Sequence, residues 1–248
     1  MKRAFDFLAA LAGLLILSPL LALVAAAIWL EDRHSPFFMG KRVARGGGVF
    51  RMVKFRSMVP NAWRTGVSST SAGDRRITRV GSILRRAKLD ELPQLWNVLA
   101  GDMSFVGPRP QVETDAGMYT EEERRLLSVR PGITDLASIV FADEGEILSG
   151  SADPDLLYNQ IIRPWKSRLG LLYIDHATFV VDIQLIFLTL TSALSRPRAL
   201  AGVVGMLETW SASSTLRFIA ARQGKLFPGP PPGAAEIVQR YPSQSAHA

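Results

Sequence analysis

The adjacent carboxylates Asp90 and Glu91 are the side chains of this sequence best suited to carry chemistry. Pro93 follows closely, and a proline is tolerated only in the first turn of a helix. The pattern therefore puts both carboxylates at the start of a helix predicted over residues 89–100, where the helix dipole and free N–H groups favour anions. Carboxylates there stay ionised, as a nucleophile or a Mg²⁺ ligand must be. By itself, an Asp-Glu pair is more often explained by the ordinary preference of helix starts for acidic residues.

Basic side chains bracket this pair. Arg85 precedes it, Arg109 follows in a proline-braced turn, and Arg130 lies in a second proline turn. Lys54 and Arg56 end a predicted hairpin. Guanidinium groups bind phosphate oxygens through two parallel hydrogen bonds, and neighbouring prolines restrict where they point. Each arginine alone is most simply a solvated surface charge, but together they favour a diphosphate substrate beside the carboxylates.

The elements that must hold these residues are mixed. Strand-like residues on either side of a glycine turn at 46–48 predict a hairpin over 37–58, and the polar residues 60–76 predict a loop. An apolar segment, 179–194, is interrupted by Asp182 and Gln184 and predicts an interfacial or buried helix. Further helices are predicted over 81–88, 89–100, 119–128 and 155–174, with Leu92, Leu95, Trp96 and Leu99 as core residues of the second. The expected fold class is α+β and mostly helical.

The N-terminal segment Phe7–Leu30 is a run of 24 mostly apolar residues, long enough to cross a bilayer and too long for a signal peptide. Ser18-Pro19 lies in the middle of it and predicts a kink. Basic residues flank the run on both sides, which is the mark of a cytoplasmic flank. The residues leave two arrangements open, a single spanning helix and a re-entrant helix that returns to the side it entered.

Composition limits the classes of partner. The net charge of the 248 residues is +7, so an anionic partner is expected: phosphates, anionic lipid or nucleic acid. Nucleic acid is disfavoured because the arginines lie in proline turns beside carboxylates, without an interleaved aromatic pattern. The absence of cysteine excludes disulfides and thiol nucleophiles, and the three histidines are scattered.

Four segments carry a resemblance to a known family: Lys54–Met58, Leu89–Leu99, Gly101–Pro110 and Arg130–Thr134. Their residues and order resemble those of the bacterial sugar transferases, the monotopic polyprenol-phosphate phosphoglycosyl transferases. The resemblance covers roughly residues 1 to 195 and implies that the N-terminal helix is re-entrant, broken at Ser18-Pro19. It also implies location at the bacterial inner membrane, with the catalytic domain on the cytoplasmic face.

The resemblance further implies a two-step reaction. By matching position, Asp90 is the nucleophile that attacks the sugar-bearing phosphate of a UDP-sugar, and Glu91 helps to hold Mg²⁺ or the acceptor phosphate, so that both carboxylates are candidate metal ligands. Arg85 and Arg109 bind phosphates. The acceptor is a polyprenol (undecaprenyl) phosphate, and the product initiates exopolysaccharide or other glycan assembly.

The chain departs from the family pattern at three places. Lys88 stands where Ser or Thr often caps the helix, and Asp135 stands where Gly is frequent. No counterpart is evident after about Arg198. The expected domains are therefore a membrane helix (1–32), a catalytic domain (33–198) and a partly disordered extension (199–248). A non-catalytic, membrane-anchored scaffold of a polysaccharide assembly complex is the alternative to an enzyme.

Overall fold

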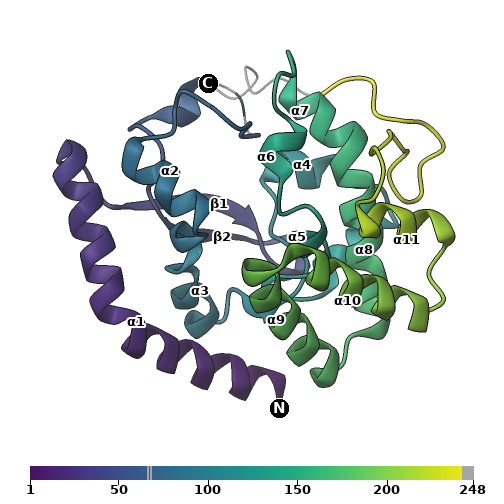
Figure 1. The fold of residues 1–248 in the computed structure, drawn as a ribbon, viewed down its shortest axis with the longest axis horizontal. Helices are drawn as coiled ribbons and strands as arrows, with labels where there is room; N and C mark the ends of the chain where they lie inside the picture. Colours follow the sequence, from purple (N-terminus) through teal and green to yellow (C-terminus); the bar gives the residue numbers. More distant parts are fainter. Residues whose placement is uncertain (66, 68, 242–248) are drawn as a thin grey trace.

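The computed structural model describes residues 1–65, 67 and 69–241 as an α+β fold that is mostly helical, which confirms the predicted fold class (Figure 1). The α-helices are α1 Lys2–Asp32, α2 Arg79–Arg86, α3 Gln94–Ala100, α4 Glu113–Gly117, α5 Leu136–Val140, α6 Glu144–Ile147, α7 Pro154–Leu157, α8 Arg163–His176, α9 Phe179–Leu194, α10 Arg196–Thr209 and α11 Ser214–Ala221. The strands are β1 Phe37–Val43, β2 Val49–Phe55, β3 Ser104–Val106 and β4 Gly132–Thr134. Tighter 3₁₀ turns are η1 Arg45–Gly47, η2 Ala62–Thr65, η3 Leu89–Glu91 and η4 Glu123–Ser128, and a π-helical turn, η5 Tyr158–Ile162, leads into α8.

The predicted hairpin is present. Strands β1 and β2 pair antiparallel, with Phe37 opposite Phe55 at one end and Val43 opposite Val49 at the other. The buried side chain of Asn97 in α3 fastens the hairpin to the helix, because its Oδ1 accepts from the Val53 N–H at 2.9 Å and its Nδ2 donates to the Arg51 carbonyl at 2.8 Å. The end of β2 therefore lies against the segment that carries the two carboxylates.

The continuous helix predicted over residues 89–100 is wrong. The segment divides into η3 and α3, and Pro93 is the residue that caps α3. Proline has no N–H to give to an α-helical hydrogen bond, so the chain makes a tighter turn before it. Lys88, which enters that turn, has a left-handed backbone (φ 57°) and gives no side-chain cap. Trp96, predicted to be a core residue, is 59% exposed, whereas Leu95 is buried as predicted.

A short parallel pair brings two sequence motifs together. Strand β3 lies beside β4, with Ser104 opposite Gly132 and Val106 opposite Thr134. The backbones approach so closely at the strand ends that a Cβ on Gly107 would lie 2.3 Å from the Arg130 carbonyl oxygen. A Cβ on Gly132 would lie 2.2 Å from the Gly107 nitrogen. These glycines are required by close backbone packing, and they fix the start of the turn that carries Arg109.

We expect Gly107→Ala to disturb the position of Arg109 and to destabilise the fold. The added methyl group meets backbone rather than a movable side chain, so the two strands must separate. The expected loss is about 1–3 kcal/mol in the free energy of unfolding, as for other overpacked sites. Thermal unfolding followed by circular dichroism measures it. Gly117→Ala is the matched control, because nothing lies within 4 Å of a Cβ there; equal melting temperatures for the two variants would contradict the prediction.

The main hydrophobic core joins the middle of the chain to its C-terminal part. Residues of α5, α8 and α9 form one buried cluster with side chains of α10 and α11, among them Leu136, Leu169, Leu185, Val203 and Ile219. The last two lie beyond residue 198, so α10 and α11 share the core of the preceding residues. The predicted division at 198/199 itself stays a prediction.

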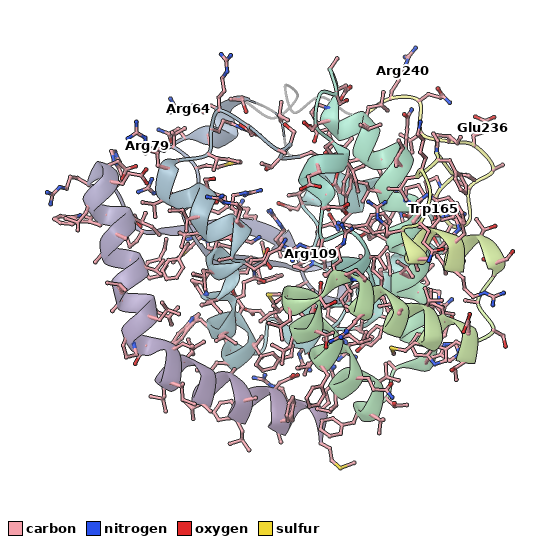
Figure 2. The ribbon with its side chains drawn as sticks, viewed as in Figure 1. Arg64, Arg79, Arg109, Trp165, Glu236 and Arg240 are labelled. Carbon is pink, nitrogen blue, oxygen red and sulfur yellow. The ribbon has the colours of Figure 1, made fainter. Side chains whose placement is uncertain are left out.

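The proline-rich segment 226–233 contains no helix or strand, as expected, yet it is held against α8. The Trp165 indole N–H donates to the Phe227 carbonyl at 3.1 Å, and Arg168 donates to the Pro230 carbonyl at 2.8 Å. Figure 2 shows Trp165 beside this C-terminal segment. The predicted disorder of the last residues falls on 242–248, outside the described residues.

Helix α1 lies along one side of the molecule and bends near its middle (Figure 1). Pro19 is the proline inside it, and Ser18 Oγ donates to the Leu15 carbonyl at 2.8 Å. Such a pairing of Ser and Pro is a recognised cause of helix kinks. By length and composition α1 is able to cross a membrane, and most of its apolar stretch is not buried within the protein.

Both ends of α1 are fastened to the rest of the fold. At its start, Lys2 Nζ lies 2.5 Å from Asp182 Oδ2, and the Asp6 carboxylate accepts from Ser104 Oγ at 2.9 Å. At its end, Asp32 receives two hydrogen bonds from Arg56, each 2.6 Å.

The predicted helix over 179–194 is α9; it buries Asp182 and Leu185 on one face and exposes large apolar side chains on the other, Val180, Phe187 and Leu190 among them.

Candidate active site

Glu91 lies at the centre of a charged cluster built from three separate elements. Its carboxylate accepts from Lys54 of β2 at 3.1 Å and from both terminal nitrogens of Arg109, one of them at 3.1 Å. Burial alone would raise the pKa of Glu91, but Arg109 and then Lys54 outweigh it and hold the pKa well below its ordinary value. In turn, the adjacent Glu91 carboxylate raises the pKa of Arg109. Glu91 is therefore a fixed anion between two cations.

Asp90 is the contrasting carboxylate. It is only 6% exposed, and its carboxylate accepts no hydrogen bond from any described residue. Burial and then the neighbouring Glu91 raise its pKa, while the charges of Lys54, Arg85 and Arg109 act in the opposite direction. Adjacent carboxylates whose environments push their pKa values apart are suited to different chemical roles. The unengaged Asp90 has its oxygens free to react, whereas those of Glu91 are already bound.

The five basic residues predicted to bind phosphate are placed unequally. Lys54 and Arg109 contact Glu91 directly, and Arg85 in the last turn of α2 lies near enough for its charge to lower the pKa of Asp90. In the view of Figure 2, Arg109 lies near the middle of the molecule, between the hairpin side and the α5–α11 side. These three cations surround the carboxylates, as the sequence indicates.

The other two basic residues are engaged elsewhere. The Arg56 guanidinium is 8% exposed; it forms the paired hydrogen bonds with Asp32 and also donates to the Ser35 carbonyl at 2.7 Å. Arg130 donates from Nε to the Gly101 carbonyl at 2.9 Å. Arg56 thus fastens the end of α1 to the residues just after β2, and Arg130 fastens its own proline turn to the end of α3. Phosphate contacts by these two residues stay predictions, and the structure gives each a structural role.

Sequence reasoning missed a second ion pair next to Arg109. Lys166 of α8 contacts Glu144 of α6, and the charges of Glu144 and Arg109 influence each other's pKa. Lys166 and Arg109 also line one cavity together with Ser138 and Tyr158. No local pattern marks Glu144 or Lys166, because they lie in different helices and meet only in the folded chain.

The carboxylates fit a magnesium ion only in part. Mg²⁺ in phosphoryl-transfer sites takes one or two carboxylates and completes its shell with water and substrate phosphate oxygens. Asp90 offers free carboxylate oxygens for this, whereas Lys54 and Arg109 already hold those of Glu91. Among the described residues no group of three His, Asp or Glu side chains gathers as a protein-only site requires. Asp90 with a diphosphate substrate is the donor set that fits.

We expect activity to fall as the pH rises through about 8, because burial lowers the pKa of Lys54 to about 8. Above that value Lys54 loses its charge, and with it one cation of the cluster. The free energy of unfolding changes in the opposite direction. In the unfolded chain the pKa of Lys54 is about 10.4, so between about pH 8 and pH 10.4 the unfolded chain binds more protons than the folded one. Raising the pH through this range therefore favours folding.

A pH profile of kcat/KM combined with thermal unfolding separates the two effects. Lys54→Arg keeps the positive charge at high pH and is expected to abolish the decline of kcat/KM near pH 8. A decline that persists in Lys54→Arg would contradict the assignment to this residue.

Comparison with known proteins places these features in a family. The sequence model of the bacterial sugar transferases matches residues 1–196, and this chain belongs to that family. The match spans the hairpin, both carboxylates and the turn of Arg109, which confirms the resemblance seen in the sequence. It ends at the start of α10.

Three relatives illustrate the range of the family. The exopolysaccharide production protein PSS of Rhizobium leguminosarum is 38% identical over 207 residues, covering 79% of this chain and 96% of its own length. The undecaprenyl-phosphate glucose phosphotransferase of Komagataeibacter xylinus is 40% identical over 196 residues, 76% of this chain and 35% of its own length. A UDP-N-acetylgalactosamine-undecaprenyl-phosphate N-acetylgalactosaminephosphotransferase of Aeromonas hydrophila is 34% identical over 197 residues, 78% of this chain. This chain covers 44% of the length of that protein.

Proposed function

We propose that this protein is a phosphoglycosyl transferase that moves a sugar-1-phosphate from a UDP-sugar to a polyprenol (undecaprenyl) phosphate. The observation that carries the proposal is the pairing of an unengaged carboxylate, Asp90, with an anion clamped between cations, Glu91. The names of the relatives, which include a glucose and an N-acetylgalactosamine phosphotransferase acting on undecaprenyl phosphate, support these substrates. The family's exopolysaccharide members support a role in initiating glycan assembly.

In the first half of the proposed reaction, an Asp90 oxygen attacks the phosphorus that bears the sugar. The bond between that phosphorus and the bridging diphosphate oxygen breaks, and UMP leaves with the electron pair. Catalysis of phosphoryl transfer is mainly positioning and charge neutralisation. Arg109, Lys54 and Arg85 supply positive charge around the reacting phosphate, which offsets the repulsion between carboxylate and diphosphate. Asp90 together with the diphosphate would hold Mg²⁺, which would supply further positive charge to the reaction.

In the second half, a phosphate oxygen of the polyprenol phosphate attacks the same phosphorus. The bond to the Asp90 oxygen breaks, which restores the free carboxylate and gives a sugar diphospho-polyprenol. Splitting the transfer into two displacements lets one set of cations serve both substrates in turn. The charges needed are the same in both halves, since each attack brings an anion toward a phosphate.

We propose that α1 is a re-entrant helix in the bacterial inner membrane and that the catalytic residues face the cytoplasm. The contacts of Lys2 and Asp6 at one end, and of Asp32 at the other, support this arrangement because both ends bind the same folded body. A straight spanning helix would put its ends on opposite sides of the bilayer. The bend at Pro19 offers the reversal of direction that a re-entrant helix needs.

We expect both ends of α1 to be accessible only from the cytoplasm. Single cysteines at Ala4 and at His34, introduced into this cysteine-free chain, are to be labelled in intact cells and in opened membranes. A membrane-impermeant maleimide should label both positions only after the membranes are opened. Labelling of the position 4 cysteine in cells whose outer membrane alone is permeabilised would indicate a spanning helix instead.

The proposed activity is tested by following UMP release from UDP-glucose, UDP-galactose and UDP-N-acetylgalactosamine, with undecaprenyl phosphate and Mg²⁺. We expect UMP and a sugar diphospho-lipid in equal amounts from at least one donor. The alternative, a non-catalytic scaffold of a polysaccharide assembly complex, predicts no UMP from any of them. Chelation with EDTA should stop the reaction, and restored Mg²⁺ should restart it.

A further inference from the structure

Gln94, the first residue of α3, is a buried polar side chain whose amide the fold leaves unpaired. It is 0% exposed, and neither its amide nitrogen nor its amide oxygen has a hydrogen-bond partner among the described residues. Asn97, one turn further along the same helix, is equally buried, but its amide donates to Arg51 and Asp102 and accepts from Val53. The helix therefore contains one fully paired structural amide and one that is unpaired.

An unpaired buried amide disfavours folding. Native proteins pair nearly all buried polar side-chain atoms, so the few exceptions call for a functional explanation. A methionine or leucine at position 94 would fill a similar volume without any polar atom to satisfy. Stability alone therefore does not account for glutamine here.

The complementary unpaired group lies one helical turn away. Asp90 is buried and its carboxylate accepts no hydrogen bond from the part of the chain that the structure describes, and Gln94 follows it by four residues. The chain makes tight helical turns between them, since Leu92 N–H donates to the Leu89 carbonyl and Leu95 N–H to the Leu92 carbonyl, at 3.2 and 3.1 Å. These bonds span three residues, as in a 3₁₀ turn, so Gln94 follows Asp90 by little more than one turn. The glutamine side chain has three rotatable bonds and can be directed toward Asp90. An unpaired donor thus stands one turn from an unpaired acceptor.

We propose that Gln94 is a positioning residue for the nucleophile: its amide N–H binds one Asp90 oxygen during the reaction and directs the other at the donor phosphorus. The two groups are not hydrogen-bonded in the present structure, so a side-chain rotation makes this contact when substrate arrives. A carboxylate held through one oxygen loses rotational freedom and attacks from a defined direction. The inference rests on the proposed transferase function and adds a residue outside the charged cluster to it.

Gln94→Met tests this inference, because methionine has a similar length and no amide. We expect kcat for UMP release, and the single-turnover rate of forming the phosphosugar adduct on Asp90, to fall about ten- to hundredfold, the factor associated with a hydrogen bond to a charged group. KM for the UDP-sugar should be unchanged. The melting temperature should stay equal or rise, because an unpaired amide has been removed. Asn97→Leu is the matched control and should melt at a lower temperature, since it leaves its partners unpaired.

Three outcomes would overturn the inference. An unchanged kcat in Gln94→Met with an equal or higher melting temperature would mean that the amide is merely tolerated. A melting temperature several degrees lower would mean that it is paired for folding. Either of these results, obtained with a wild type that releases UMP, refutes the inference alone. A wild type that releases no UMP refutes the proposed function and, with it, this inference.

Discussion

Replacing Asp90 by asparagine is expected to lower turnover by at least about 10³-fold, the order of magnitude seen when a covalent nucleophile is removed. Asparagine has nearly the same shape, but its uncharged amide cannot attack phosphorus to form the proposed phosphosugar intermediate. The fold should tolerate the change. Since burial and the neighbouring Glu91 both raise the pKa of Asp90, the ionised carboxylate is held at some cost to folding. Removing that charge is expected to leave the melting temperature equal or higher.

Mass spectrometry gives the most direct reading of this prediction. Wild-type protein incubated with a UDP-sugar and no lipid acceptor should gain the mass of a sugar phosphate on the peptide that contains Asp90, and Asp90→Asn should not. Asp102→Asn is a suitable control, because this carboxylate accepts from Asn97 at the far end of α3 and an asparagine oxygen can do the same. Full turnover by Asp90→Asn would exclude the proposed mechanism.

Arg109→Lys is expected to lower kcat/KM by about 10²-fold, comparable with the loss of one preorganised donor at a developing anion. Lysine keeps the positive charge but cannot donate two parallel hydrogen bonds, as Arg109 does to Glu91. Arg109→Leu should lose more activity and also stability, because Glu91 then keeps Lys54 as its one remaining ion-pair partner among the described residues.

Arg130→Lys provides the comparison for Arg109→Lys. Both arginines lie in proline turns, but Arg130 contacts the Gly101 carbonyl rather than a carboxylate. We expect Arg130→Lys to change kcat/KM less than about threefold, as for most substitutions away from a charged network. Steady-state kinetics on both variants measure this difference. Equal losses of kcat/KM in Arg109→Lys and Arg130→Lys would contradict it and would show that the two arginines act on the substrate alike.

The exposed apolar surface bears on how the proposed transferase would meet its proposed lipid acceptor. Large apolar side chains remain exposed on α1, such as Leu15, Ile16 and Leu23, and the exposed face of α9 is equally apolar. Phe5 of α1 lies against Phe179 of α9, with ring centroids 5.4 Å apart, so the two helices adjoin. A polyprenol phosphate has an apolar chain and an anionic head. A surface that combines apolar helices with a nearby cluster of cations suits both parts.

Much of this protein is determined by short-range pattern in its sequence. Strand-like residues on either side of a glycine turn predict the β1–β2 hairpin, apolar length predicts α1, and Pro19 predicts its bend, because each depends on residues close together in the chain. The carboxylate pair and the three cations around it, Lys54, Arg85 and Arg109, are also indicated, since their motifs lie in a few short segments. The family resemblance includes the segments that carry Lys54, the two carboxylates and Arg109.

Only the tertiary structure decided which of those charges act together. Lys54 lies on β2 and Arg56 follows two residues later, just after the strand, yet Arg56 is bound to Asp32 of α1 and Lys54 to Glu91. Adjacent carboxylates likewise differ, because Glu91 is held by two cations and Asp90 is left unengaged. The partners come from segments distant in the chain. Which partner each charge meets depends on how those segments pack, and local sequence periodicity carries no information about that packing. The residue types of the candidate site are therefore set by the sequence, and the different surroundings of its two carboxylates by the fold.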